Sequence, residues 1–313
     1  MMRAAVLTSQ GDPNVLAIQE HYTKPQLSAD HGVLIKVKAI AISSADLMTR
    51  RGFTAGPVIT PPEIIGSECV GIVEAVSKEL ERLDDQVAET LDGSHGAKYR
   101  VGDVVVGLMG GMGRYFNGCY AEYVVLPPGC LSAPLTMLNA TSLPMFSDST
   151  LSFGLLAAIP GAFLVAHGIL VKSLQVKSTD TLLVQGGSSA VGLAIASISK
   201  GLCGLNKIVG TTRSKEKVTR MKAAGFDTVV VLPREEAVPS SAKELAGIIK
   251  EKGGELSGFT TIVDLIGATN IPVSLLSANL SGGSRVCMAG MLAGAYHFEE
   301  PFSPMGIVSV RTY

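Results

Sequence analysis

The chain has 313 residues, a hydrophobic fraction of 47%, a charged fraction of 17% and a formal net charge of −1. This length suffices for two domains of ordinary size, and the composition excludes an intrinsically disordered or low-complexity protein. The near-zero net charge gives no electrostatic reason to expect nucleic acid or an anionic membrane as a partner.

The first 150 residues predict a β-rich domain. Short apolar or alternating runs separated by Gly, Pro, Asp and Asn predict strands at Ala4–Leu7, Val33–Ile42, Glu68–Val76, Val104–Leu108 and Ala121–Leu126. The polar segment over residues 77–100 is expected to be a solvated insertion, either a surface helix or a mobile loop. The apolar stretch Leu151–Val171 contains Pro160, three glycines and His167, which favours a buried helix pair over a membrane span.

Residues 151–313 predict alternating strands and helices. The expected strands are Thr181–Gln185, Lys207–Thr212, Thr228–Leu232, Thr260–Ile266, Arg285–Ala289 and Ile307–Thr312, and the expected helices are Val191–Lys200, Lys215–Ala224 and Ser241–Lys252. Such alternation is typical of a parallel sheet with helices on both faces. Six strands complete a doubly wound α/β fold of the kind that binds dinucleotides.

A glycine- and serine-rich turn follows the first of these strands. The strand TLLVQ runs into GGSSAVG and then into the helix LAIASISK. In the G-x-G-x-x-G pattern Gly187 and Gly192 hold the outer positions and Ser189 the middle one. Small residues and the unpaired N–H groups of a helix N-terminus allow a pyrophosphate to approach. We therefore expect residues Gly187, Ser188, Ser189, Ala190, Val191 and Gly192 to bind a dinucleotide rather than form an ordinary tight turn.

The end of the next strand indicates which dinucleotide binds. An enzyme that prefers NAD carries Asp or Glu there to bind the ribose 2′-hydroxyl. Here the segment reads GTTRSKEK, with no carboxylate before Glu216. Thr212, Arg213 and Lys217 could contact a 2′-phosphate, with Ser214 completing the contact. The sequence therefore favours NADP(H), and a solvated basic turn is the alternative.

Further segments resemble the medium-chain dehydrogenase/reductase superfamily, in its zinc-free quinone-reductase and enoyl-reductase branch. PPEIIGSECVGIVEAV resembles the P-x-x-x-G-x-E-x-x-G-x-V segment of that family, and YRVGDVVVG carries its G-D-x-V turn. HGVLIKVKAIAISSADLMTRRG, GCYAEYVVLP and AAIPGAFLVAHGIL are similar to successive parts of its substrate domain and of the helix that enters its cofactor domain. VDLIGAT and VCMAGML resemble the strand ends beside the nicotinamide, which implies that Gly267 and Met291 bind the cofactor.

The resemblance implies a GroES-like β-barrel substrate domain over residues 1–150 and a Rossmann domain over 151–313. It also bears on zinc. The positions of two catalytic zinc ligands carry Ser43 and Ser67, and the stretch 108–119 holds one cysteine where a structural site needs four. Because serine hydroxyls are poor zinc ligands, we expect no metal.

Without a metal, reduction of a quinone or an α,β-unsaturated carbonyl demands less of the protein than alcohol oxidation does. The developing oxyanion needs a hydrogen-bond donor, for which Ser43, Arg50 and Tyr115 are the candidates, with Asp46 positioning the loop. Each has an equally good structural interpretation. Asp46 could cap a helix, Arg50 could pair with a surface acid, and Tyr115 could belong to a surface loop instead of a substrate lid. His167 fits a hydrogen-bonded core histidine better than a catalytic one.

Three functional hypotheses follow. The first is a reductase that transfers hydride from NADPH to a small electrophile, either a quinone or an activated enone. The second is a catalytically weak NADP(H)-binding sensor or scaffold, because the chain ends where family members continue and Met48 stands where zinc-free relatives often carry a tyrosine acid. The third is a trans-acting enoyl reductase of a synthase.

Three further expectations concern the environment of the chain. Five cysteines without C-x-x-C spacing indicate free thiols in a reducing, cytoplasmic location. The N-terminus passes directly into a strand pattern, so no signal peptide is expected. The terminal strand could pair across a sheet edge to form a homodimer.

Overall fold

The computed structural model describes residues 1–27, 32–52, 63–80, 99–135, 153–233, 241–279, 281, 283–290 and 292, and the backbone of 309–312. The chain forms two compact units, Met1–Gly161 and Ala162–Tyr313. The sequence places a domain boundary after residue 150, which lies outside the described residues. The division in the structure falls within a helix that runs from Pro160 to His167.

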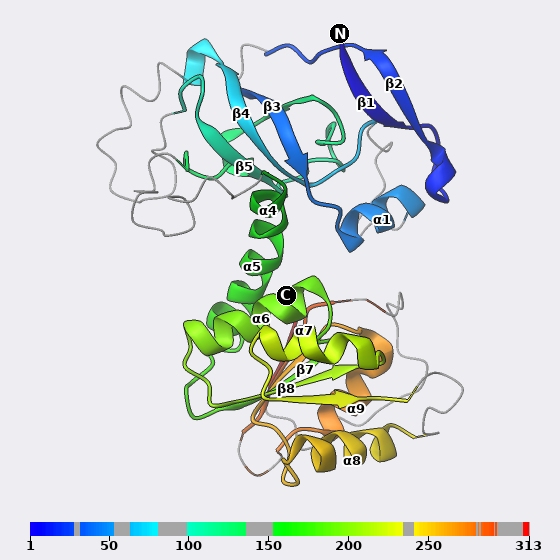
Figure 1. Ribbon diagram of the computed structural model, residues 1–313, viewed down its shortest axis with the longest axis vertical. Helices are drawn as coiled ribbons and strands as arrows, with labels where there is room; N and C mark the ends of the chain where they lie inside the picture. The colour runs from blue at the N-terminus through cyan, green and yellow to red at the C-terminus, as the bar shows by residue number, and fades with distance from the viewer. Residues whose placement is uncertain are drawn as a thin grey trace. The chain divides into compact units, whose positions relative to one another are not determined.

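The first unit contains a four-stranded antiparallel sheet in the order β5-β4-β3-β6 and a separate β1-β2 pair (Figure 1). Its strands are β1 (Met2–Leu7), β2 (Leu16–Tyr22), β3 (Val33–Ile40), β4 (Glu68–Val76), β5 (Val104–Leu108) and β6 (Tyr123–Leu126), and helix α1 spans Ser44–Arg51. Inward-facing residues of this sheet pack with Cys119 and Met112 into one hydrophobic cluster. This cluster forms because strand side chains alternate between the two faces of a sheet.

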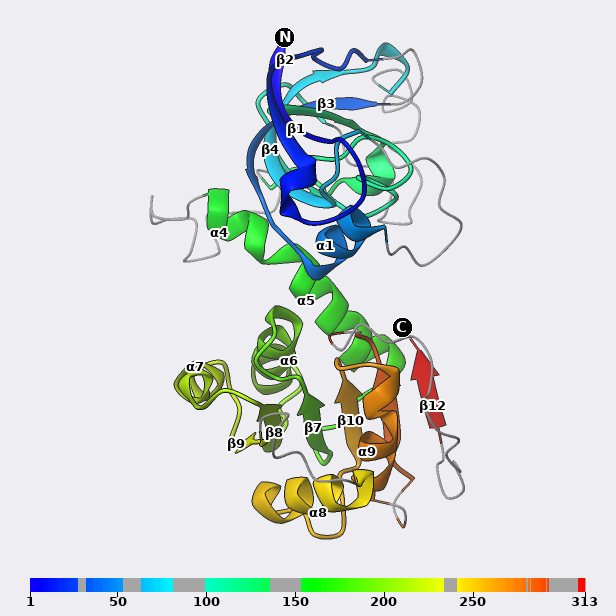
Figure 2. The same ribbon diagram turned by 90° about the vertical axis from the view of Figure 1, so that its right-hand side faces the viewer.

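The second unit is built on a six-stranded parallel sheet in the order β12-β11-β10-β7-β8-β9 (Figure 2). The strands are β7 (Thr181–Gln185), β8 (Lys207–Thr212), β9 (Thr228–Val231), β10 (Thr261–Asp264), β11 (Arg285–Met288) and β12 (Ser309–Thr312). The chain starts at β7 and moves outward in both directions, which is the doubly wound order. The predicted α/β fold is confirmed.

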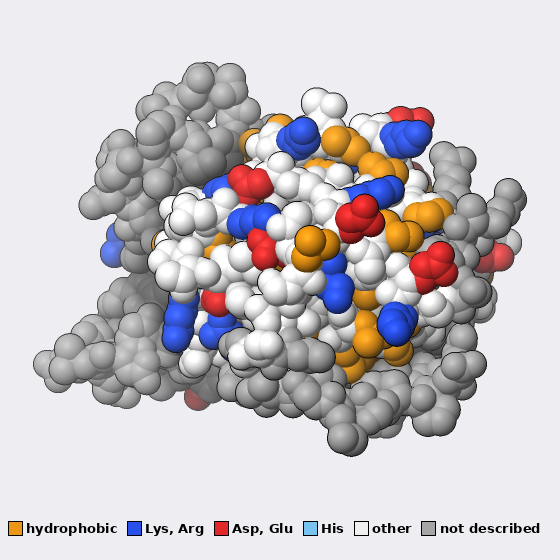
Figure 3. Space-filling model, turned by 90° about the horizontal axis from the view of Figure 1, so that it is seen from below, with side chains coloured by type: hydrophobic (Ala, Val, Ile, Leu, Met, Phe, Trp, Pro, Cys, Tyr) orange, Lys and Arg blue, Asp and Glu red, His pale blue; other side chains and the backbone are white. Residues whose placement is uncertain are grey.

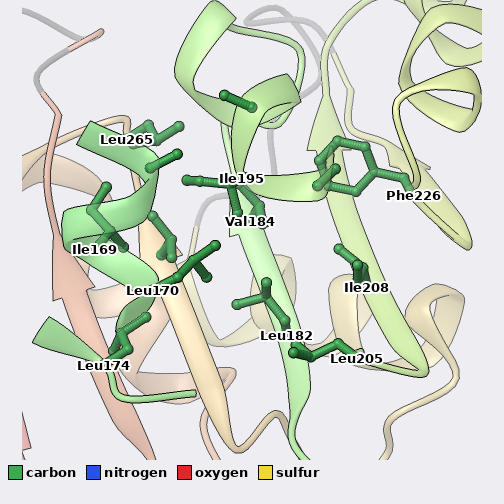
Figure 4. Packing of buried hydrophobic residues seen from close by; sticks show 14 of the residues in the cluster. Ile169, Leu170, Leu174, Leu182, Val184, Ile195, Leu205, Ile208, Phe226 and Leu265 are labelled. Atoms are coloured by element: carbon green, nitrogen blue, oxygen red, sulfur yellow. The ribbon is translucent and has the colours of Figure 1, made fainter. Parts of the chain in front are cut away.

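Two separate hydrophobic clusters cover the faces of this sheet. Helices α6 (Ala190–Gly201) and α7 (Val218–Ala223) contribute to one, and α8 (Ala242–Gly253) and α9 (Ile271–Leu276) to the other. Figure 4 shows the first cluster, which Leu182 and Val184 of β7, Ile208 of β8 and Ile195 of α6 share. Their strand neighbours Leu183 and Val209 belong to the second cluster.

A long apolar helical run leads into the second unit. It comprises α4 (Phe153–Ala158), α5 (Pro160–His167) and a π-helical turn, Gly168–Ser173. By length and composition this run could cross a membrane, since it has 21 residues and a mean hydropathy of 2.0. Core helices meet the same criteria, and 28% of the most apolar 18-residue window of this run is buried. The prediction of a helix pair agrees with the structure.

The structure differs from the sequence prediction in several elements. Strand β2 and helix α9 were not expected from the sequence, and the predicted helix 215–224 divides into a 3-10 turn, Lys215–Lys217, followed by α7.

Charged side chains of both signs are mixed on the surface. On the described part of the face in Figure 3, Lys and Arg side chains are interspersed with Asp and Glu. That mixture agrees with the small net charge.

Candidate functional site

The glycine- and serine-rich turn connects β7 to α6 through a left-handed residue. Gly186 has φ +77°, a conformation that side chains disfavour. The amide of Gly187 donates to the Thr211 carbonyl oxygen at 3.1 Å, and the amide of Gly186 donates to Thr211 Oγ1 at 3.2 Å. The turn is thereby fastened to the neighbouring strand β8.

Two glycines in this turn leave no room for a side chain. A Cβ on Gly192 would lie 2.6 Å from the Gly187 carbonyl oxygen, so the start of α6 packs directly on the backbone of the turn. A Cβ on Gly187 would lie 2.9 Å from Met221 Cε and from Phe226 Cζ. Both glycines therefore serve the close approach of helix and strand that dinucleotide folds require.

The start of α6 offers backbone donors to an anion. Ser189 is the N-cap, and its hydroxyl accepts a hydrogen bond from the Gly192 amide at 3.1 Å. The amides of Ser188, Ala190 and Val191 donate no hydrogen bond to any described residue. A helix N-terminus with free N–H groups attracts a pyrophosphate, so the chemistry of this turn fits a dinucleotide.

The end of β8 adds hydroxyl and basic side chains. Thr212 Oγ1 donates to Ser188 Oγ at 3.3 Å and accepts from the Ser214 amide at 3.2 Å. Because Thr212 is buried, its hydroxyl is not presented to solvent and instead supports the turn through these two hydrogen bonds. Arg213 and Lys217 are both exposed beyond the strand end. The structure thus brings these predicted residues together around one edge of the sheet.

The carboxyl end of β10 lies beside that of β7, with Asp264 in register with Gln185. Gly267, predicted from the sequence, is buried in the turn after β10 and has φ +116°. Met291 lies outside the described residues. Asp264 was missed by sequence reasoning, although a carboxylate that ends an apolar strand is itself unusual.

A second polar cluster lies in the first unit, around Asp46. The carboxylate accepts hydrogen bonds from the Ser43 amide and hydroxyl, both at 2.9 Å, and from the Ser67 hydroxyl at 2.8 Å. The Ser43 hydroxyl in turn accepts from the Asp46 amide, which completes a capping box at the start of α1. The capping role anticipated for Asp46 is therefore present. The single hydroxyl proton of Ser43 is directed at Asp46 and not toward a substrate.

Glu68, next to Ser67, is a buried carboxyl group with an altered pKa. Burial is the main cause that raises its pKa, and the nearby Asp46 carboxylate raises it further. The Gly161 amide opposes this shift by donating to Glu68 Oε1 at 2.6 Å. Burial and Asp46 also raise the pKa of Tyr120, which makes that phenol a poor proton donor.

The remaining predicted residues differ in their surroundings. Arg50 is 5% exposed, its Nε has no hydrogen-bond partner, and it forms no ion pair with a described carboxylate. Tyr115 is 65% exposed in a loop with several left-handed residues, among them Met109. His167 and Val165 are half-buried on α5. Among the described residues no group of three His, Cys, Asp or Glu side chains could hold a metal ion.

Comparison with known proteins agrees with this architecture. Residues 29–134 match the alcohol dehydrogenase GroES-like domain. The chain is similar to quinone oxidoreductases. The human quinone oxidoreductase is 28% identical over 93% of this chain and 73% of its own length. The predicted resemblance to the medium-chain dehydrogenase/reductase superfamily is thereby confirmed.

Two further relatives bear on the cofactor. An NAD-dependent alcohol dehydrogenase of Saccharolobus solfataricus is 26% identical over 96% of this chain and 81% of its own length. A mycobacterial protein solved in complex with NADPH is 27% identical, with a TM-score of 0.74, over 100% of this chain and 81% of its own. These relatives support an oxidoreductase that uses a pyridine nucleotide, and they differ in which nucleotide they use.

Proposed function

We propose that the protein reduces a quinone or an activated enone with NADPH, without zinc. The observation that carries the proposal is the combined edge of β7 and β8. There, the free amides of Ser188, Ala190 and Val191 lie beside a strand end that carries Arg213 and Lys217 in place of a carboxylate. When bound, NADPH would supply hydride to the electrophilic carbon of the acceptor.

Most of the predicted cofactor residues have a specific task in this proposal. The turn residues Gly187–Gly192 would hold the pyrophosphate through backbone donors, and Arg213 with Lys217 would pair with the 2′-phosphate. Gly267 and Met291 would lie near the nicotinamide. Of the three candidate donors to a substrate oxyanion, Tyr115 is the one whose hydroxyl contacts no described partner. The Ser43 hydroxyl donates its hydrogen bond to Asp46, and the Arg50 side chain is buried.

The first experiment follows NADPH oxidation with a panel of quinones, enones and enoyl thioesters, with NADH as the comparison. We expect turnover with quinones or enones and a lower KM for NADPH than for NADH. A preference for enoyl thioesters would instead identify a trans-acting enoyl reductase. Tight NADPH binding by calorimetry without turnover would favour a sensor or scaffold. Absence of both binding and turnover would reject the proposal.

The double variant Arg213→Ala/Lys217→Ala tests the choice of cofactor. Each lost charge-assisted hydrogen bond costs about 1.5–3 kcal/mol, so we expect the KM for NADPH to rise at least tenfold. The KM for NADH should change little, because NADH lacks the 2′-phosphate. Lys215→Ala is the matched control, since Lys215 is an exposed cation in the same turn that the proposal does not use. Equal effects of the two changes would contradict the assignment.

A further inference from the structure

Asp264, the last residue of β10, is a fully buried carboxylate with four hydrogen-bond donors. Its Oδ1 accepts from the amides of Ile266 at 2.9 Å and Gly267 at 3.0 Å. Its Oδ2 accepts from Asn270 Nδ2 at 2.7 Å and Ser274 Oγ at 2.5 Å. No Lys, Arg or His among the described residues forms an ion pair with it. A buried charge without a counterion is tolerated only when such donors replace its hydration.

The hydrogen bonds continue to the neighbouring strand. Gln185 Nε2 donates to Ser274 Oγ at 2.9 Å, and the Ser274 hydroxyl donates to Asp264. Ser274 therefore links Gln185 of β7 to Asp264 of β10 by hydrogen bonds. Gln185 is 1% exposed and is the last residue before the glycine- and serine-rich turn. One buried network therefore connects the turn that follows β7 with the turn that follows β10.

The position of this network is set by the topology of the sheet. Strands β7 and β10 are the neighbours from which the chain winds outward in opposite directions. Ligands of doubly wound sheets bind beyond the carboxyl ends of the strands at this switch point. With the pyrophosphate at the β7 turn and the 2′-phosphate at the β8 end, the nicotinamide half of the cofactor must extend toward β10.

The turn after β10 needs support because its conformation is unusual. Gly267 has φ +116° and ψ −164°, a region open essentially to glycine. The consecutive amides of Ile266 and Gly267 both donate to Asp264 Oδ1. Without that acceptor both buried amides would be unsatisfied, and the turn would relax to another conformation.

We propose that Asp264 is a positioning residue that holds the turn 265–268 in the shape that accepts the nicotinamide ring. This inference rests on the proposed function, because it assumes that a pyridine dinucleotide binds at this edge. Asp264 acts through the turn and through Ser274, and it does not itself contact the cofactor.

The test compares two ligands on the Asp264→Asn variant. An amide has the shape of the carboxylate, but its NH2 group would face two donors and break their hydrogen bonds. We expect the dissociation constant of NADPH to rise about tenfold or more, as the loss of one to two buried hydrogen bonds predicts. Adenosine 2′,5′-bisphosphate, which lacks the nicotinamide half, should bind the variant as it binds the unchanged protein. Both constants are measured by calorimetry.

Asp180→Asn is the matched control. Asp180 is a buried carboxylate at the opposite end of the same sheet, where it accepts from the Lys177 amide at 2.7 Å and from Arg285 at 2.5 Å. Its loss should lower the thermal midpoint but leave the ratio of the two dissociation constants unchanged. Ser274→Ala leaves the Asp264 carboxylate in place and removes the hydrogen bonds that the Ser274 hydroxyl donates to Asp264 and accepts from Gln185, so it serves as the second variant if Asp264→Asn does not fold. We expect it to weaken NADPH several-fold and the fragment not at all.

Three results would overturn the inference. Equal weakening of NADPH and of the fragment would mean that Asp264 supports the fold generally. Unchanged NADPH affinity in both variants would mean that the turn does not depend on it. If the unchanged protein binds NADPH no more tightly than adenosine 2′,5′-bisphosphate, the nicotinamide half contributes no affinity, and this inference fails while the nucleotide site stands. If it binds neither ligand, the proposed function itself fails.

Discussion

Close backbone packing at Gly192 shows how the absence of one side chain shapes the glycine- and serine-rich turn. The first turn of α6 lies so near the Gly187 carbonyl that no Cβ fits between them. That closeness brings the free amides of Ala190 and Val191 next to the end of β7. A methyl group would push the helix start outward and separate donors that must act on one anion.

The variant Gly192→Ala should therefore lose both stability and nucleotide affinity. Overpacking of this kind costs about 1–3 kcal/mol of unfolding free energy. We expect a lower urea midpoint and at least a tenfold weaker NADPH binding by calorimetry. Gly201→Ala, in the same helix, is the control, because nothing lies within 4 Å of its Cβ position. It should be neutral or slightly stabilising, and a similar loss in both variants would refute the packing argument.

The sequence indicated most of the residues at the nucleotide turn but few of their contacts. Gly187, Gly192, Ser188 and Thr212 were found because strand, small residues and helix follow one another in a known spacing. Spacing does not specify side-chain orientation. The sequence therefore did not show that the Ser189 hydroxyl caps α6, or that the Ser43 hydroxyl donates a hydrogen bond to Asp46. Asp264 was missed because all four of its donors follow it in a segment without a recognisable period.

At the scale of elements, strand positions were predictable wherever burial imposed a pattern. Strands β4, β5, β7 and β8 have the predicted bounds. Strand β2 was missed because its residues Leu16–Tyr22 are half-buried or exposed throughout, so no apolar alternation marks it. Helix α9 has six residues, which is too short for a helical period to be seen.

Helix α5 begins against a carboxyl group from another element, and this contact has a pH dependence. Burial raises the pKa of Glu68 above the usual value of 4.5 for a glutamate carboxyl group. Between that value and the folded pKa, the unfolded chain releases the proton while the folded chain retains it. The contribution of Glu68 to the free energy of unfolding is therefore largest below pH 4.5, and it is lost as pH rises through the pKa of the folded protein.

We expect Glu68→Gln to remove this dependence. Gln can still accept from the Gly161 amide but cannot ionise. The stability of the variant relative to the unchanged protein should thus improve as pH rises from 4.5 toward neutrality. Urea unfolding at several pH values measures the difference. Glu74→Gln is the control, because the pKa of exposed Glu74 is lowered by Lys24 and its dependence has the opposite sign. A difference that does not vary with pH would mean that Glu68 has the same pKa in the folded and the unfolded chain, which would contradict this prediction.

At the scale of the whole molecule, the sheet of the second unit ends at β12. One side of β12 pairs in parallel with β11, and its other side has no strand neighbour among the described residues. An edge strand with unpaired backbone groups is a pairing surface. We propose that two copies of the chain pair there to form a homodimer.

Light scattering coupled to size-exclusion chromatography tests this proposal. We expect twice the chain mass of 32.5 kDa at micromolar concentration. Hydrogen exchange supplies the location, because pairing should slow the amides of 309–312 when concentration rises. A monomer at all concentrations, or slowed exchange confined to other segments, would count against pairing at β12.

The alternation of buried residues along the central strands also has an evolutionary consequence. Leu182 and Leu183 are adjacent in sequence, yet they belong to different hydrophobic clusters on opposite faces of the sheet. The sheet therefore acts as a partition between two independently packed layers. Substitutions on one side need compensation only from that side, since effects add when residues share no partners. The helices on one face of the sheet can therefore diverge without constraining those on the other face, while the strand ends stay in place.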